Sequence, residues 1–173
     1  MRFVLIVLLL LGVAEAKRGA GPYIGGGYGI SDIKDGGHYD LQDKSSNGYV
    51  VYAGAYINDY LSVELEHIGS LSYTQRNNQE VDFTFTDVNT QAHYPLYDGD
   101  FDIYAKFGAG YVSQGSSGHT LLYGAGAAYR INERYAVRVG YDYFDFGIDT
   151  SGDGTVDKKM AIEYLFCSFE VQF

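Results

Sequence analysis

Five charged residues stand in stretches where polar and apolar side chains alternate: Glu64, Glu66, Lys106, Arg138 and Asp142. Alternation with a period of two is the pattern of a β-strand, whose successive side chains point to opposite faces. Because both signs of charge are present, these side chains can neutralise one another if the fold brings their strands together. Such a cluster would either form a paired, closed interior or line a narrow ion path with a gate. Arg130 and Glu170 are possible further members.

Residues 149–157 place oxygen-bearing side chains at alternate positions and a glycine at the sixth, as calcium loops do. The twelfth position of such a loop holds a bidentate glutamate, but here it is Met160. A turn rich in Gly and Asp accounts for the same residues. We therefore predict a turn without a metal, with calcium binding as the weaker alternative.

Catalytic signals are faint. The four histidines, His38, His67, His93 and His119, lack the spacing of metal ligands. No nucleophile motif and no phosphate-binding loop is present, and His119 with Ser116 and Ser117 is the one weak His and Ser combination in a loop. We predict no enzymatic activity and no cofactor.

The elements that must position the charges are strands, because no long amphipathic helical pattern occurs. Turn residues divide the chain into eight segments. The expected strands are 23–31, 48–57, 60–75, 81–96, 101–113, 120–131, 135–147 and 158–173.

The connections alternate in length. Those at 58–59, 97–100 and 132–134 are short, whereas those at 32–47, 76–80, 114–119 and 148–157 are longer and rich in Gly, Asp, Asn and Ser. Short turns at one end and longer loops at the other are typical of up-and-down outer-membrane barrels. Spanning strands need about 9–11 residues each, which eight segments of this length provide. The predicted fold is an all-β, eight-stranded antiparallel transmembrane barrel.

Three segments show two distinct faces. Leu61, Val63, Leu65 and His67 alternate with Ser62, Glu64 and Glu66, and the segments 101–113 and 135–147 behave alike. A soluble sheet would also alternate, but a small soluble barrel would turn its apolar face inward. In a membrane barrel the apolar face is outside and the charges are inside. Tyrosines near the segment ends then suit interfacial girdles: Tyr111, Tyr129, Tyr135, Tyr141 and Tyr143.

Two segments alternate less cleanly. Val81, Phe83 and Phe85 share one parity, whereas Val88, Ala92 and Tyr94 share the other. In the last segment, Met160, Ile162 and Tyr164 oppose Leu165, Phe169, Val171 and Phe173. Either a β-bulge or an overhang beyond the membrane would reset the phase.

The N-terminus predicts export. Met1 and Arg2 precede an apolar run from Phe3 to Val13, and residues 14–16 form a small-x-small cleavage site. This is the layout of a signal peptide, and the run is too short to span a bilayer as a helix. We expect cleavage after Ala16, leaving residues 17–173 as the barrel domain.

The composition narrows the class further. A net charge of −10 argues against nucleic-acid binding. The single cysteine, Cys167, argues against a disulfide-stapled domain.

The C-terminal residues 169–173 alternate and close on Phe173, and residues 21–29 and 104–111 are rich in Gly and aromatic side chains. In these features the chain resembles the small OmpA-like and OmpX-like outer-membrane barrels of Gram-negative bacteria, also called porin-family proteins. The resemblance covers essentially all of residues 17–173. It implies that Phe169, Val171 and Phe173 form a signature read by the barrel-assembly machinery, and that outer-membrane lipid surrounds the chain.

The resemblance implies a location more than an activity, because family members anchor, adhere, resist complement or leak small solutes. The chain stops at the barrel, so a role in tethering the cell wall is not expected. Three hypotheses remain. The barrel has a structural or surface-interaction role, with external loops that contact an extracellular ligand or host surface. It is a narrow porin-like channel through the charged interior. It is a soluble exported barrel that binds a small apolar ligand.

Overall fold

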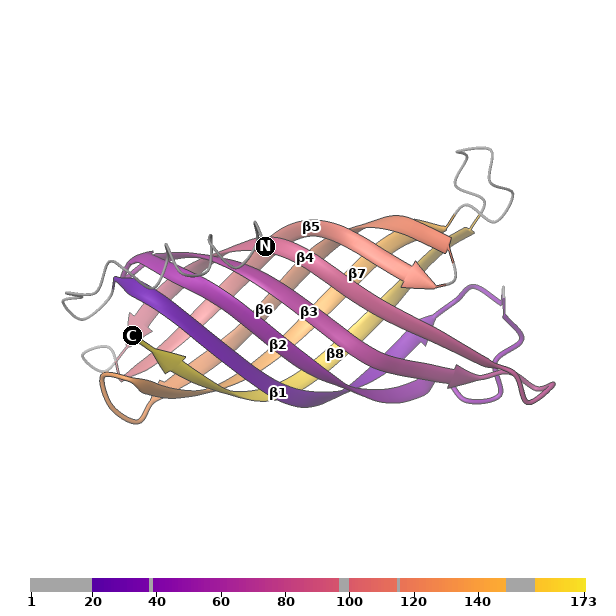
Figure 1. Ribbon diagram of the computed structural model, residues 1–173, viewed down its shortest axis with the longest axis horizontal. Coiled ribbons are helices and arrows are strands. Elements are labelled where there is room, and N and C mark those ends of the chain that lie inside the picture. Colours follow the sequence, from indigo (N-terminus) through magenta and orange to yellow (C-terminus); the bar gives the residue numbers. More distant parts are fainter. Residues whose placement is uncertain (1–19, 38, 97–99, 115, 149–157) are drawn as a thin grey trace, which may run out of the picture.

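A computed structural model describes residues 20–37, 39–96, 100–114, 116–148 and 158–173 (Figure 1). These residues form one closed barrel of eight antiparallel strands, as predicted. Each strand pairs with the next along the chain, and β8 closes the barrel on β1 from Tyr23↔Gln172 to Lys34↔Ala161. The strands are β1 Gly21–Lys34, β2 Ser45–Asn58, β3 Leu61–Thr74, β4 Glu80–Leu96, β5 Phe101–Gln114, β6 Ser116–Arg130, β7 Tyr135–Ile148 and β8 Lys158–Gln172.

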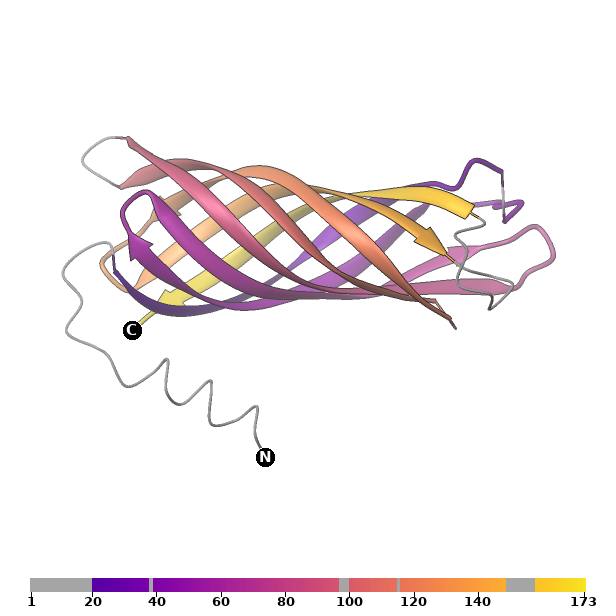
Figure 2. The ribbon, with the colours of Figure 1, turned by 90° about the horizontal axis from the view of Figure 1, so that it is seen from above.

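The two ends of the barrel differ (Figure 2). At the turn end, short connections join β2 to β3, β4 to β5 and β6 to β7, and the backbone N–H of Phe173 donates to the carbonyl of Pro22 at 2.9 Å. At the loop end, residues 35–44 and 75–79 connect β1 to β2 and β3 to β4. Both ends of the barrel's chain therefore lie at the turn end.

The predicted external loop at 114–119 is wrong. β5 reaches Gln114 and β6 starts at Ser116, and the pairs Tyr111↔His119 and Val112↔Gly118 continue the ladder. The predicted loop 32–47 likewise shortens to 35–44. Polar and glycine-rich residues pair as strands here because each neighbouring strand offers their backbone groups hydrogen-bond partners.

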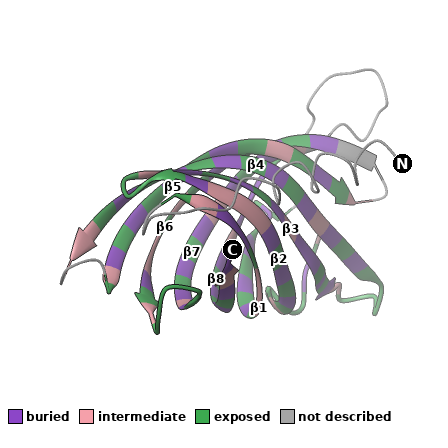
Figure 3. Cartoon of the chain, turned by 60° about the vertical axis from the view of Figure 1, so that its left-hand side comes forward, coloured by how far each residue is buried: buried purple, intermediate pink, exposed green. Residues whose placement is uncertain are grey.

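The lower part of the barrel, toward the turn end, is apolar outside and polar inside. Val63, Leu65 and Val139 are exposed on the outer surface, whereas Glu64 and Arg138 are buried inside. Figure 3 shows the resulting alternation of exposed and buried residues along the strands. Such an apolar outer surface is typical of membrane barrels.

The upper part, toward the loop end, has the opposite polarity. Phe83 and Phe85 of β4 are buried inside, whereas Glu80 and Asp82 face outward. In β8, Met160 and Ile162 are buried, whereas Lys159 is exposed. This is the arrangement of a water-soluble barrel, so the upper part is built to stand above a lipid surface.

This inversion explains the irregular pattern of the fourth and eighth segments. Burial alternates without interruption from Glu80 to Tyr94 in β4, so β4 contains no phase-resetting bulge. The inward residues of β4 change instead from apolar near its start to polar further along the strand, as expected if the start of β4 extends beyond the membrane. A register shift does occur in the partner strand β3, between Ile68 and Leu71, where Ser70 takes a positive φ of 65°.

Candidate functional site

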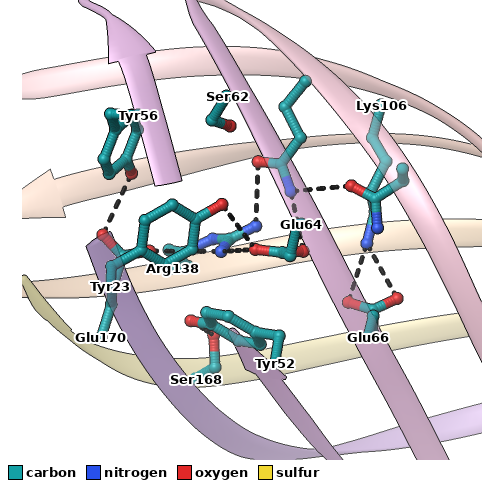
Figure 4. A network of polar contacts seen from close by, with 12 residues as sticks. Tyr23, Tyr52, Tyr56, Ser62, Glu64, Glu66, Lys106, Arg138, Ser168 and Glu170 are labelled. Carbon is teal, nitrogen blue, oxygen red and sulfur yellow. Dashed lines mark hydrogen bonds and ion pairs between the residues drawn. The ribbon is translucent and has the colours of Figure 1, made fainter. Parts of the chain in front are cut away.

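Arg138 is the centre of the lower interior (Figure 4). Its Nη1 donates to Glu64 Oε2 at 2.7 Å and to Glu170 Oε2 at 3.2 Å. Its Nη2 donates to Gln91 Oε1 at 3.2 Å. The guanidinium is buried, so its charge is balanced by carboxylates from β3 and β8 rather than by water, and the β4 amide accepts a further hydrogen bond.

Tyrosines complete the surroundings of this guanidinium. The rings of Tyr52 and Tyr104 lie 4.4 and 5.0 Å from the guanidinium carbon, within the range of cation–π contacts. The hydroxyl of Tyr23 donates to Glu64 and that of Tyr56 donates to Glu170, each at 3.0 Å. Aromatic rings thus fill the space that a wider barrel would leave to water.

Lys106 forms a second ion group closer to the loop end. Its ammonium lies 2.9 Å from Glu66 Oε2 and 2.8 Å from Asp142 Oδ2. Gly124 leaves room for this group, because a Cβ at that position would lie 2.3 Å from Asp142 Oδ1. The five charges singled out in the sequence, together with Glu170, therefore meet inside the barrel as two ion groups.

Arg130 does not join either group. Its Nε lies 3.7 Å from Asp102 Oδ2, and its Nη1 donates to Gln172 at 3.2 Å. The guanidinium also lies 5.0 Å from the ring of Tyr56. Arg130 thus covers the turn end of the interior rather than pairing within it.

Sequence reasoning missed a polar ladder along β4. Asn89 Nδ2 donates to Asp87 Oδ1 at 3.0 Å, and Gln91 Nε2 donates to Asn89 Oδ1 at 3.1 Å and to Glu64 Oε1 at 2.8 Å. These residues share the parity of Phe83 and Phe85. Assigning every second residue of β4 to the inward face, starting from Phe83 and Phe85, would have predicted that these polar side chains point inward.

Ser62, His93 and Asp102 also form an unforeseen chain. Ser62 Oγ lies 2.9 Å from His93 Nε2, and His93 Nδ1 lies 3.1 Å from Asp102 Oδ1. The order resembles the serine, histidine and aspartate arrangement of hydrolases. However, Ser62 is 0% exposed, so no substrate carbonyl reaches its oxygen. We interpret the three residues as a structural hydrogen-bond relay.

The loop end is closed by residues 35–44. Leu41 is buried and forms a bridge with Gln75. The ring of Tyr39 packs edge-on against Phe83 with centroids 6.2 Å apart, and its hydroxyl donates to Gln114 Oε1 at 2.8 Å. This loop, which joins β1 to β2, therefore extends across the barrel mouth to contact β4 and β5.

Asp35 anchors that loop. Burial alone would raise the pKa of its carboxyl, but the N–H groups of Tyr39 and Gly37 and the ammonium of Lys44 outweigh burial, so the pKa lies below its usual value. The N–H of Tyr39 donates to Oδ2 at 3.1 Å, and Lys44 Nζ lies 3.5 Å from Oδ1. The ionised carboxylate thus links the two ends of the loop, from residue 35 to residue 44.

The remaining candidates lie elsewhere. Among the described residues, no group of three or more His, Cys, Asp or Glu side chains is arranged to hold a metal ion, and no helix is long and apolar enough to cross a membrane. The 149–157 segment and the proposed leader fall outside the described residues. Phe169 of β8 and Phe173, the residue after β8, are exposed.

Comparison with protein families decides the class. The model of the outer membrane protein beta-barrel domain matches residues 3–163. The chain belongs to this family. Its barrel is thus an outer-membrane barrel.

Solved structures show the same fold. Neisserial surface protein A is 15% identical, with 90% of this chain and 99% of that chain covered and a TM-score of 0.61. The attachment invasion locus protein Ail of Yersinia pestis is 18% identical, with 91% and 100% covered and a TM-score of 0.58. Outer membrane protein W of E. coli is 15% identical, with 91% and 100% covered and a TM-score of 0.53. The comparison with curated protein sequences gives no match.

The Lys106 ion group provides a first test. Lys106→Met leaves Glu66 and Asp142 buried without a partner, and we expect it to lower the free energy of unfolding by about 3–5 kcal/mol. Lys34→Met, which removes the partly exposed pair with Glu163, serves as control and should cost less than about 1 kcal/mol. Urea unfolding in lipid vesicles measures both. An equal decrease in the free energy of unfolding in the two variants would show that the Lys106 group is not a paired charge cluster.

The Asp35 anchor predicts a pH dependence. A carboxyl whose pKa is lowered by folding stabilises the fold above its unfolded pKa of about 3.9, and this contribution is lost as the pH falls through the folded value. Asp35→Asn should therefore lower the thermal midpoint at pH 7, and the difference from wild type should shrink below about pH 4. Asp40→Asn, at an exposed pair with Arg76, should change little. A pH-independent difference for Asp35→Asn would contradict this role.

Proposed function

We propose that the protein is a closed, non-conducting barrel of the bacterial outer membrane, with a surface-interaction role carried by its loop end. The observation that carries this proposal is the filled interior. Two ion groups and tyrosine rings occupy the lower part, apolar side chains occupy the upper part, and residues 35–44 cover the mouth. A filled barrel offers no route through it, so its exposed ends are the surfaces available for interaction.

The two other hypotheses are less well supported. Outer-membrane family membership and the exposed apolar belt argue against a soluble exported barrel. The channel hypothesis requires water along the interior, but the charges that would line it are enclosed and paired with one another. An eight-stranded barrel is just wide enough for side chains to fill. The same enclosure of Ser62 favours a protein without catalytic activity.

The proposed partners follow from location. The lipid-facing belt contacts outer-membrane lipid, and Phe169, Val171 and Phe173 form the signature that the barrel-assembly machinery reads. Residues 1–16 are removed after export.

The Ail barrel has been solved with a heparin analogue, sucrose octasulfate, and a second neighbour is named a surface protein. In this chain we assign contact with an extracellular ligand or host surface to the loop end.

Conductance in a planar lipid bilayer tests the closed state. The refolded wild-type barrel should insert without producing discrete current steps, because no hydrated path crosses its interior. Insertion is verified independently by its electrophoretic mobility shift on heating. Steps in wild type that change with Lys106→Ala or Arg138→Ala would replace this proposal with the channel hypothesis.

Labelling of intact cells tests which end faces outward. In a Cys167→Ser background, Asn77→Cys in the 75–79 loop should react with a membrane-impermeant maleimide. Glu133→Cys in the β6–β7 turn should react only after the outer membrane is permeabilised. Both parent side chains are exposed, so solvent accessibility is matched. The reverse labelling pattern would place the loop end in the periplasm and remove its surface role.

A further inference from the structure

The upper interior contains a complete apolar layer to which every strand contributes one side chain. These side chains are at most 1% exposed. They are Ile33 of β1, Val50 of β2, Ile68 of β3, Phe85 of β4, Val112 of β5, Leu122 of β6, Phe144 of β7 and Ile162 of β8. We call this layer the apolar stopper.

Strand register divides the stopper into two arcs, which are offset where they meet because Val112 pairs with Gly118 and not with Leu122. Val50 pairs with Ile68, Ile68 with Phe85 and Phe85 with Val112, which makes one arc across β2 to β5. A second arc runs across β6, β7, β8 and β1 through the pairs Leu122↔Phe144, Phe144↔Ile162 and Ile162↔Ile33. Each arc joins neighbouring strands, so neither leaves a gap between its members.

Phe85 and Phe144 connect the two arcs across the barrel. Their ring centroids are 4.4 Å apart, which is direct ring contact. Above them, Phe146 lies 5.4 Å from Phe85 and 5.7 Å from Phe83. The centre of the barrel is therefore occupied by aromatic rings at this level.

The stopper and the ion groups would resist an ion differently. Paired charges can exchange one partner for a passing ion or water, as polar pore linings do. An apolar layer offers an ion nothing in place of its hydration shell, and apolar constrictions close pores by excluding water. We infer that the apolar stopper, rather than the Lys106 and Arg138 ion groups, is the barrier that keeps this barrel closed. The inference rests on the proposed closed state and identifies the element that produces it.

The lower interior also predicts what would pass if the stopper were opened. Carboxyl groups outnumber basic groups among its buried residues: Glu64, Glu66, Asp87, Asp102, Asp142 and Glu170 against Lys106 and Arg138. A path through this region would attract cations over anions. Opening the stopper should therefore create a cation-selective current.

Three double variants, each refolded into planar bilayers, test the inference. Phe85→Ser with Phe144→Ser places hydroxyls where the rings met and should produce discrete current steps absent from wild type. Its reversal potential in a KCl gradient should show selectivity for K⁺. The matched control is Phe107→Ser with Tyr123→Ser, an aromatic pair 5.5 Å apart on the lipid-facing surface, and this control should stay silent.

The third variant, Glu66→Gln with Lys106→Met, disrupts an ion group and leaves the stopper intact, so it should also stay silent. Current from this variant, with a silent Phe85/Phe144 variant, would overturn the inference while leaving the closed wild-type barrel in place. Current from wild type would instead overturn the proposed function. If the double serine variant does not refold, Phe144→Ala, which removes one central ring, takes its place. The same current steps are then expected, and their absence together with current from the Glu66/Lys106 variant would overturn the inference.

Discussion

Closure of the backbone ladder between β1 and β8 is the constraint on which the rest of the structure depends. A spanning segment in lipid has no water to satisfy its N–H and C=O groups, so an open sheet edge is not tolerated there. Pairing from Tyr23↔Gln172 to Lys34↔Ala161 removes both edges at once. Closure also divides every strand into an inward and an outward face, and all further features follow from which residues each face receives.

Closing only eight strands leaves an interior that side chains must fill. The lower half is filled by paired charges of opposite sign, with Arg138 held by Glu64 and Glu170 and Lys106 held by Glu66 and Asp142. The upper half is filled by apolar side chains, as in a soluble protein. The outer surface changes in the opposite sense, so the two halves together match a barrel that is partly in lipid and partly in water.

Much of this was predictable from the chain. The alternation of residues 61–67 and 135–143 was sufficient to place Glu64 and Arg138 on an inward face, and the turn residues were sufficient to count eight strands. Two predictions were wrong or incomplete. Residues 114–119 looked like a loop because Gly, Ser and His carry weak strand signals, yet residues 116–119 pair with β5, and His119 also pairs with Gly147 of β7. The ladder from Asp87 to Gln91 was missed because the inward residues of β4 change from apolar to polar along the strand.

The sequence by itself determined the class of fold and the alternation that turns the charges inward, because period-two patterns and turn residues act locally and are visible without partners. Only the tertiary structure decided which charges meet. Glu64 and Arg138 lie on β3 and β7, and their contact depends on barrel closure and register, which no local pattern encodes. The same holds for the contact between Phe85 and Phe144. Residues on opposite walls become neighbours only because the sheet curves through a full turn.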